Sequence, residues 1–394
     1  MQGFRVIYNT FYILQFASLY RSHTLYKTDL KSVRILSVLV ILALVGLIIV
    51  ETSQVNVPKP WQTEKRRASK QMLRCMETIK EYRLKKGVLL SDPDLDPRIA
   101  ALLGQNYTVI TTDRGSWSAK ISAMNPNFAA VVVSMFKEAG LREGDVVAVG
   151  FTGSMPGMNI ATLCAIDALK LKPIIITSVG ASEWGANDPD FTWLDIEALL
   201  YNEGLIPARS IAASIGGGKD IGRGLSDLGQ EAIRNAIARN QVDLIYHKNL
   251  EANIRHRMAI YDSVAKAMQR PIRAYVNVGG GVASLGSTIN KKFIQSGLSK
   301  SMPRRNFPTK GALILFAERN IPIIHLLEIE RLARQYGIYS ASEEYVPAEL
   351  LEVGVGDVFE ERRYHVGIAA LVLVVLIGII SVLVWKDFKR HRLP

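Results

Sequence analysis

The chain has 394 residues, a formal net charge of +12 and a mean hydropathy of +0.14, which is unusual for a purely soluble protein. The terminal segments 1–50 and 366–394 carry +4 and +3 of this charge, and the 315 residues between them carry +5. Most of the basicity therefore belongs to the ends, which argues against nucleic acid as a partner. Two cysteines exclude a disulfide framework and a cysteine-based metal cluster, and the six histidines form no ligand motif, so neither a metal nor a cofactor is expected.

Each end of the chain holds one long uncharged segment. Residues 35–50 are 16 residues without a charge and residues 366–385 are 20, close to the roughly 20 residues that a helix needs to cross a bilayer. A cleavable signal peptide is the alternative for the first segment, but 34 residues precede it and no Ala-x-Ala-like site follows in residues 51–55. We expect two uncleaved helices in membrane lipid.

Lysines and arginines beside these segments predict their orientation, because cationic flanks stay cytoplasmic. Four lie in the fifteen residues before the first segment and two in the fifteen after it, while four follow the second segment and two precede it. Both termini are therefore predicted to be cytoplasmic, with the middle of the chain outside the cell membrane. The expected parts are a cytoplasmic segment 1–34, a transmembrane helix 35–51, an amphipathic helix and linker 52–97, an α/β domain 98–350, a linker 351–365, a transmembrane helix 366–385 and a basic cytoplasmic tail 386–394.

The first predicted element after the anchor is an amphipathic helix over residues 63–86, where apolar residues recur every three or four positions among Lys, Arg and Glu. It is expected to link the anchor to the domain. Residues 91–97 contain two prolines and three aspartates and are predicted to form a boundary loop.

Beyond this loop, short apolar runs alternate with helical ones. Predicted strands cover residues 146–151, 173–178, 209–213, 243–247, 272–278 and 321–326. Predicted helices cover residues 127–139, 159–169, 192–202, 226–240, 250–269 and 328–336. Runs of β-branched residues without polar alternation indicate strands covered on both faces, and the alternation of strands and helices indicates a parallel sheet. The predicted fold is α/β, with a doubly wound, mostly parallel, Rossmann-like sheet.

In such sheets ligands bind beyond the carboxyl ends of the strands, and four predicted strands here lead into loops rich in Gly, Ser and Asn. The first loop, residues 150–159, places glycines and exposed N–H groups at a helix N-terminus, which favours anions. It matches neither the phosphate-binding loop nor the Gly-x-Gly-x-x-Gly dinucleotide pattern. We interpret it as a carboxylate or peptide cradle that includes Gly153, Gly157 and Asn159, or as a capped turn without a ligand.

Ser154 in this loop is similar to a nucleophile on a strand-to-helix turn. The Gly-x-Ser-x-Gly motif is not met, however, because Thr152 and Pro156 occupy its glycine positions. Ser154 is therefore a candidate nucleophile or a candidate hydrogen-bond donor.

Other strand ends offer the base that such a serine needs. The second loop, residues 177–190, contains Glu183 and Asp188, which act as a general acid or base or else belong to the cap of the next helix. His247 ends a predicted strand and completes a triad if it reaches the same crevice, whereas a strand-end histidine is otherwise simply packed.

The third and fourth loops add backbone donors and cations. Candidate contacts in the third loop, residues 214–224, are Gly216, Gly217, Gly218, Lys219 and Arg223, a set that suits an anionic ligand. The fourth loop, residues 277–286, is uncharged and would shape a pocket through Asn277, Gly279 and Gly280. Two runs of three glycines are costly in chain entropy, which argues for close approach of a ligand or another backbone; the alternative is flexible loops without function.

Loops 150–159, 177–187 and 214–224, with an anchor at each end, resemble the poly-gamma-glutamate system proteins, which accompany the enzymes that make poly-gamma-glutamate. The resemblance covers nearly the whole chain from about Leu25 onward, and the first 24 residues look like an extension. It implies a role in synthesis, export or attachment of an anionic glutamyl polymer, with synthase or export subunits as partners. It carries no catalytic assignment, so no functional residue is transferred.

Three hypotheses follow. The leading one is a membrane-anchored accessory component of poly-gamma-glutamate synthesis and export, whose α/β domain binds the polymer or a partner subunit through the Gly-rich loops. The second is a membrane-bound hydrolase or transferase that acts on gamma-glutamyl chains, with Ser154 as nucleophile. The third is a structural scaffold, and the fold class does not choose among them.

Overall fold

The structure is a computed structural model that describes residues 33–88, 90, 92–303 and 305–390. The chain divides into two units. Pro58–Glu361 forms the larger unit, and the described part of the smaller one consists of residues 33–57 and 362–390. The predicted cytoplasmic segment 1–34 therefore lies, up to residue 32, outside the described residues.

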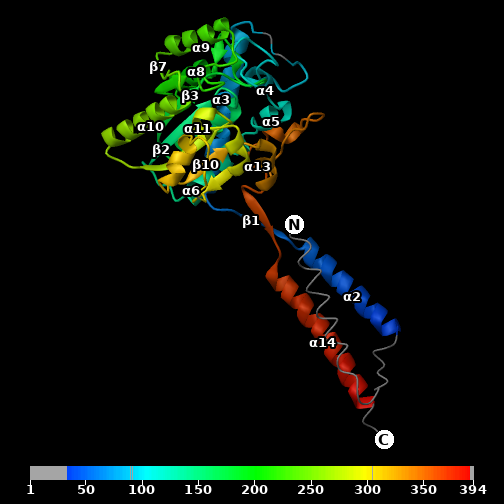
Figure 1. The fold of residues 1–394 in the computed structure, drawn as a ribbon. Helices are drawn as coiled ribbons and strands as arrows, with labels where there is room; N and C mark the ends of the chain where they lie inside the picture. The colour runs from blue at the N-terminus through cyan, green and yellow to red at the C-terminus, as the bar shows by residue number, and fades with distance from the viewer. Residues whose placement is uncertain (1–32, 89, 91, 304, 391–394) are drawn as a thin grey trace. The chain divides into compact units, whose positions relative to one another are not determined.

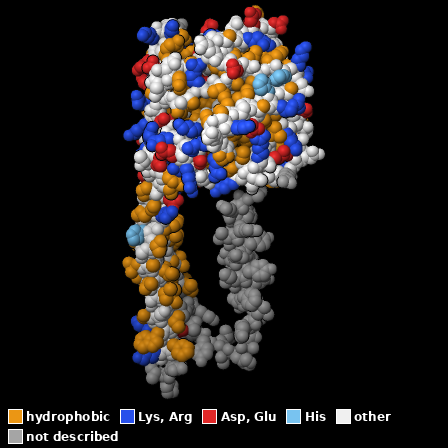
Figure 2. Space-filling model, turned by 90° about the vertical axis from the view of Figure 1, so that its left-hand side faces the viewer, with side chains coloured by type: hydrophobic (Ala, Val, Ile, Leu, Met, Phe, Trp, Pro, Cys, Tyr) orange, Lys and Arg blue, Asp and Glu red, His pale blue; other side chains and the backbone are white. Residues whose placement is uncertain are grey.

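Two long apolar helices dominate the smaller unit. α2 (Val33–Thr52) and α14 (Val366–Arg390) are both long and apolar enough to cross a membrane, and their hydrophobic side chains are exposed instead of being buried in a protein core. Figure 2 shows these side chains on the surface, with Lys and Arg near one end. A Cβ on Gly46 of α2 would lie 2.7 Å from Val372 of α14, so a glycine allows the two helices to pack closely. Both apolar segments predicted from the sequence are helical.

The larger unit is built around a seven-stranded sheet. From one edge to the other, its strands are β7 (Asp243–Leu244), β6 (Ala212–Ser214), β3 (Lys172–Ser178), β2 (Val146–Thr152), β8 (Ile272–Val278), β10 (Ile323–Leu326) and β9 (Gly297–Ser299). Every neighbouring pair is parallel except β9 with β10. The predicted α/β class with a mostly parallel sheet is confirmed. Along the chain, β3, β6 and β7 are added one after another on one side of β2. The chain then returns to form β8 on the other side of β2, so the winding direction reverses between β2 and β8.

Helices cover both faces of this sheet (Figure 1). One face packs against α3 (Gln62–Lys85), α4 (Pro97–Leu102), α6 (Asn127–Glu138), α7 (Pro156–Ala168), α8 (Trp193–Asn202) and α13 (Ile329–Gln335). The other face packs against α10 (Leu250–Ala267), α11 (Val282–Leu285) and α12 (Ala312–Glu318). The remaining elements are α5 (Trp117–Ser122), α9 (Asp227–Arg239), the 3₁₀ turns η2 (Ile289–Phe293) and η3 (Ala348–Leu351), and the strand pairs β4 (Asn187–Asp188) with β5 (Phe191–Thr192) and β1 (Val55–Pro58) with β11 (Glu360–Arg363).

Successive residues of β2 alternate between the two faces, as the geometry of a strand requires. Val147, Val149 and Phe151 pack with α3, α6 and α7, whereas Val146 and Ala148 pack with α10 and α12. All seven residues of β2 are buried. This is why the strand is a continuous apolar run in the sequence.

α3, which we expected to link the anchor to the domain, packs within the larger unit. Its apolar stripe contacts α6 and α7, and Cys75 Sγ lies 4.0 Å from Cys164 Sγ of α7. The fully buried apolar residues of α3 are Ala68, Met72, Cys75, Met76 and Ile79. Each buried Met or Ile side chain contributes roughly 1.5–3 kcal/mol, so α3 is part of the hydrophobic core. The compact unit accordingly begins at Pro58, well before residue 98.

Three strands, β6, β7 and β10, are shorter than predicted, and in the first two a side chain binds a backbone group next to the strand. β6 begins late because the N–H of Ser210 donates to the buried carboxylate of Glu197 at 2.7 Å. β7 ends early because the N–H of His247 donates to Asn253 Oδ1, also at 2.7 Å.

Candidate functional site

A cavity of about 550 Å³ opens at the carboxyl ends of the parallel strands. Its wall contains Thr152 at the end of β2, Ser178 at the end of β3 and Gly279 just after β8. The cavity thus lies beside the reversal between β2 and β8, the position where open α/β sheets bind ligands. Residues from all four Gly-rich loops line it, together with residues from segments 112–120 and 327–330.

In the first loop, Ser154 is the candidate residue that lines the cavity. The other three candidates of this loop do not line the cavity; they are Gly153, Gly157 and Asn159. A Cβ on Gly153 would lie 2.3 Å from the carbonyl oxygen of Val179, and one on Gly157 would lie 2.4 Å from that of Ala123. These two glycines therefore allow close contact between backbone segments and do not line the cavity.

A buried lysine that the sequence analysis missed holds the first two loops together. Lys120 of α5 is 2% exposed, and its Nζ donates to the carbonyl oxygen of Ser154 and lies 2.7 Å from Ser182 Oγ. The N–H of Ser182 donates to Ser154 Oγ at 3.0 Å, and all three residues line the cavity. Burial lowers the pKa of Lys120 to about 7, against the opposing effect of the negative charge of Glu183. No motif marks this lysine, because an isolated Lys in a sequence is usually exposed.

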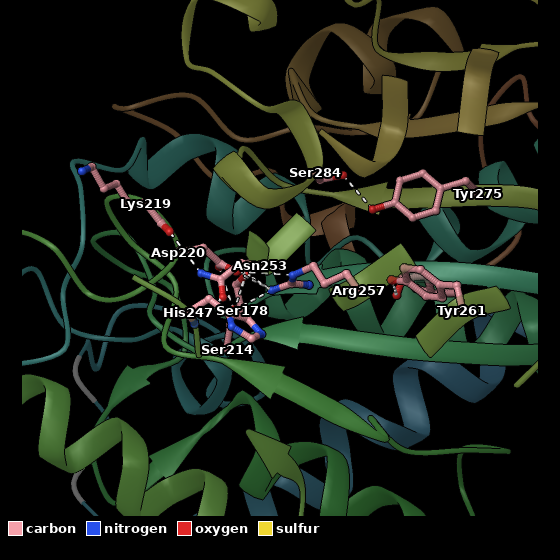
Figure 3. A network of polar contacts seen from close by, with 11 residues as sticks. Ser178, Ser214, Lys219, Asp220, His247, Asn253, Arg257, Tyr261, Tyr275 and Ser284 are labelled. Carbon is pink, nitrogen blue, oxygen red and sulfur yellow. Dashed lines mark hydrogen bonds and ion pairs between the residues drawn. The ribbon is translucent and has the colours of Figure 1, made fainter. Parts of the chain in front are cut away.

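The third loop has an unusual backbone. Gly216, Gly217, Lys219 and Asp220 have φ angles of 84°, 65°, 55° and 64°. Glycine adopts this left-handed region freely, but each non-glycine residue there costs roughly 1–2 kcal/mol. Gly216, Gly217, Gly218 and Arg223 line the cavity. Lys219 is exposed and does not line it, and Figure 3 shows its side chain pointing away from the neighbouring polar network.

A buried ion pair holds the third loop in place (Figure 3). Arg257 of α10 is 4% exposed, and its Nη2 lies 3.0 Å from Asp220 Oδ2. The hydroxyls of Ser178 and Ser214 donate to Asp220 Oδ1 at 2.8 and 2.7 Å. This network satisfies the carboxylate of a residue that lines the cavity, so it offsets the cost of the left-handed backbone.

Asn277 holds the fourth loop through a hydrogen bond to its main chain. Gly279 and Gly280 line the cavity, whereas the buried Asn277 Nδ2 lies 2.8 Å from the carbonyl oxygen of Gly279 and 2.9 Å from His325 Nδ1. Because Asn277 Nδ2 donates, Nδ1 of His325 accepts and the proton belongs on Nε2. Burial lowers the pKa of His325 to about 4, so this imidazole is neutral at neutral pH.

The three base candidates have other partners. Glu183 Oε2 accepts the N–H of Gly115 at 3.0 Å, and Asp188 Oδ2 lies 3.4 Å from Arg83. His247 is exposed, and its Nε2 lies 3.0 Å from Nδ1 of His256. Within the described residues, none of the three lines the cavity or hydrogen-bonds to Ser154. Their catalytic roles stay predictions.

The charge of the lining is positive once existing ion pairs are taken into account. Its cations are Arg114, Lys120, Arg223 and Lys291, and its acids are Asp113, Asp220, Glu328 and Glu330. Asp220 is paired with Arg257, and Glu328 with Arg331 at 2.8 Å. The lining therefore favours an anion. In the part of the chain that the structure describes, no group of three His, Cys, Asp or Glu side chains is placed to hold a metal ion.

Comparisons with protein-family models, with curated proteins and with solved structures gave no match.

Proposed function

We propose that the chain is a two-pass membrane protein of the cell envelope that binds an anionic glutamyl polymer, as an accessory component of polymer synthesis or export. The observation that carries this proposal is a cavity at the carboxyl ends of a parallel sheet whose lining holds the exposed cations Arg114, Arg223 and Lys291, while two of its four acids are already paired with arginines outside the lining. We infer that the sheet belongs to the doubly wound, Rossmann-like class, in which this is the usual ligand position.

The chemistry of the lining suits repeated carboxylates. Arg114, Arg223 and Lys291 are exposed, so they can contact several carboxylates of one chain at once, while Lys120 lies buried in the wall. Arginine binds a carboxylate through two parallel N–H groups. The main chain of Gly216 and Gly217 lines the same space, whereas the N–H of Gly218 donates to the carbonyl oxygen of Arg223. Each exposed cation contributes modestly and is screened by salt, so affinity depends on several contacts together.

The terminal helices support the membrane part of the proposal. Their side chains are almost entirely exposed, unlike those of a core helix in a soluble protein, and α14 lies far from the N-terminus, where a signal sequence would be. The excess of Lys and Arg on the outer flanks of the two segments supports cytoplasmic termini and, with them, an α/β unit outside the cell membrane.

Replacing Arg223 and Lys291 together by alanine is expected to weaken binding of fluorescent poly-gamma-glutamate to the full chain by about tenfold, because two of the cavity's cations are lost. Lys219→Ala is the matched control, since it removes an exposed cation from the same loop as Arg223 but outside the cavity. The measurement is a titration of detergent-solubilised full chain at low salt, repeated at higher salt, where wild-type binding is expected to weaken. An equal loss in Lys219→Ala would show that binding follows surface charge in general and would reject the cavity.

The same titration on sealed membrane vesicles tests the orientation, because the polymer cannot cross a bilayer. Right-side-out vesicles are expected to bind it and inverted vesicles are not. Binding confined to inverted vesicles would place the α/β unit in the cytoplasm and contradict the proposed topology.

A further inference from the structure

The amine of Lys120 and the hydroxyl of Ser182 form a close pair in the cavity wall. Their atoms are 2.7 Å apart, and Ser182, on the loop after β3, is 9% exposed and lines the cavity. A hydroxyl within hydrogen-bond reach of an amine is the arrangement that an activated serine requires. Serine–lysine pairs perform this role on unrelated folds.

We infer that Ser182 is a nucleophile and Lys120 its general base, and that this pair hydrolyses an amide bond of the glutamyl chain bound in the cavity. The substrate class rests on the proposed function. The assignment of the two residues rests on the geometry of the cavity wall.

The contacts of Lys120 select Ser182 over Ser154. Toward Ser154 the amine contacts the main-chain carbonyl oxygen, which has no proton to give up, whereas toward Ser182 it contacts the hydroxyl. Ser154 Oγ accepts the N–H of Ser182 at 3.0 Å, and its own O–H has no acceptor among the described residues. That O–H is free to donate to the oxygen of a substrate carbonyl, and the start of α7 beside it has no side-chain cap.

The surroundings of Lys120 suit it as a base. Its pKa of about 7 leaves a large fraction of the amine neutral near neutral pH, and Glu183 is the charged group that opposes this shift. A neutral amine has one lone pair and two N–H groups. In the ammonium form Nζ donates to both the Ser154 carbonyl oxygen and Ser182 Oγ. Once the amine is neutral, its lone pair can accept the Ser182 O–H across the same 2.7 Å contact while one N–H still donates to the Ser154 carbonyl oxygen.

The reaction balances without any reagent other than water. Ser182 Oγ forms a bond to the amide carbon as its proton moves to Lys120 Nζ, and the carbonyl π electrons move to the oxygen. The carbonyl re-forms as the C–N bond breaks, and the leaving nitrogen takes the proton from Lys120, which leaves an ester on Ser182. Water then attacks the ester carbon and gives a proton to Lys120. The C–O bond to Ser182 breaks, and Ser182 recovers the proton, so one amide and one water become one carboxylic acid and one amine.

The test uses detergent-solubilised full chain and a fluorophosphonate probe, with the adduct located by mass spectrometry. Wild type is expected to form one adduct, on Ser182, at a rate that rises about tenfold per pH unit below pH 7 and levels off above it. Ser182→Ala is expected to form no adduct, and Lys120→Met to react at least about 100-fold more slowly. Lys120→Arg keeps the N–H donors and the charge but cannot act as a base. Labelling as slow as in Lys120→Met, with the melting temperature of wild type, would show that Lys120 acts as a base and not only through packing.

The outcomes also separate this inference from the proposed function. An adduct on Ser154, or a pH-independent rate on Ser182, would overturn the pair. No adduct in a wild-type chain that still binds poly-gamma-glutamate would also overturn it and would leave the binding function standing. An adduct on Ser182 with shortened polymer chains supports both, whereas an adduct without any polymer binding supports the pair and rejects the glutamyl substrate.

Discussion

Arg257→Met is expected to lower the free energy of unfolding of the α/β unit by about 3–5 kcal/mol, because it leaves the carboxylate of Asp220 buried without its counter-charge. Asp220 is 1% exposed, so water does not replace the lost counter-charge unless the third loop changes its conformation. For a unit of this size the melting temperature of the full chain falls by roughly 5–8 °C. Thermal unfolding in detergent, followed by circular dichroism, measures the change.

An exposed ion pair of the same residue types provides the control. Arg319 Nη1 lies 2.7 Å from Asp262 Oδ1, but both side chains are nearly half exposed. Arg319→Met should therefore cost less than about 1 kcal/mol. If Arg257→Met costs no more than this, the buried pair does not hold the loop. The double variant Arg257→Met with Asp220→Asn should recover most of the loss, because no unpaired charge remains.

Gly157→Ala is expected to destabilise the α/β unit by about 1–3 kcal/mol and to slow probe labelling of Ser182 as well. The new Cβ would lie 2.4 Å from the carbonyl oxygen of Ala123 and 2.8 Å from its carbon, so α5 and α7 must move apart. α5 carries Lys120 and α7 follows Ser154, so this movement separates the amine from both loops. The steric cost outweighs the gain of up to about 1 kcal/mol that alanine gives within a helix.

Gly280→Ala is the matched control at the cavity. A Cβ there meets no atom within 4 Å, and the φ of Gly280 lies outside the left-handed region. Gly280→Ala should change the free energy of unfolding of the α/β unit by less than about 0.5 kcal/mol. Equal destabilisation by the two substitutions, measured by the same thermal unfolding, would show that the contact between α5 and α7 is not the reason for the glycine at 157.

The sequence predicted the sheet well where strands are long and apolar. β2, β3 and β8 are buried runs, and their parallel order follows from the helices between them. β9 and α12 were not predicted. β9 has three residues on an edge, and the apolar run of α12 has no periodicity that separates a helix from a strand.

The sequence predicted where the candidate site lies, but not which side chains form it. Four loops after parallel strands must lie at one rim of the sheet, and all four line the cavity. Which side chains enter depends on tertiary contacts. Asp220 turns inward because Arg257, 37 positions away, binds it, whereas the neighbouring Lys219 remains exposed. Lys120 was not predicted as a site residue, because its contacts are with two loops that the sequence does not place beside α5.

Zero-length cross-linking tests the central claim most directly, because carbodiimide joins a polymer carboxylate to the lysine amine that contacts it. Poly-gamma-glutamate is cross-linked to the full chain in detergent at low salt, and the joined peptides are mapped by mass spectrometry. Binding in the cavity predicts that Lys291 is the principal site, that the exposed Lys219 gives only background, and that added salt suppresses the Lys291 product. Equal yields at Lys291 and Lys219 would contradict the proposal that this cavity binds the polymer.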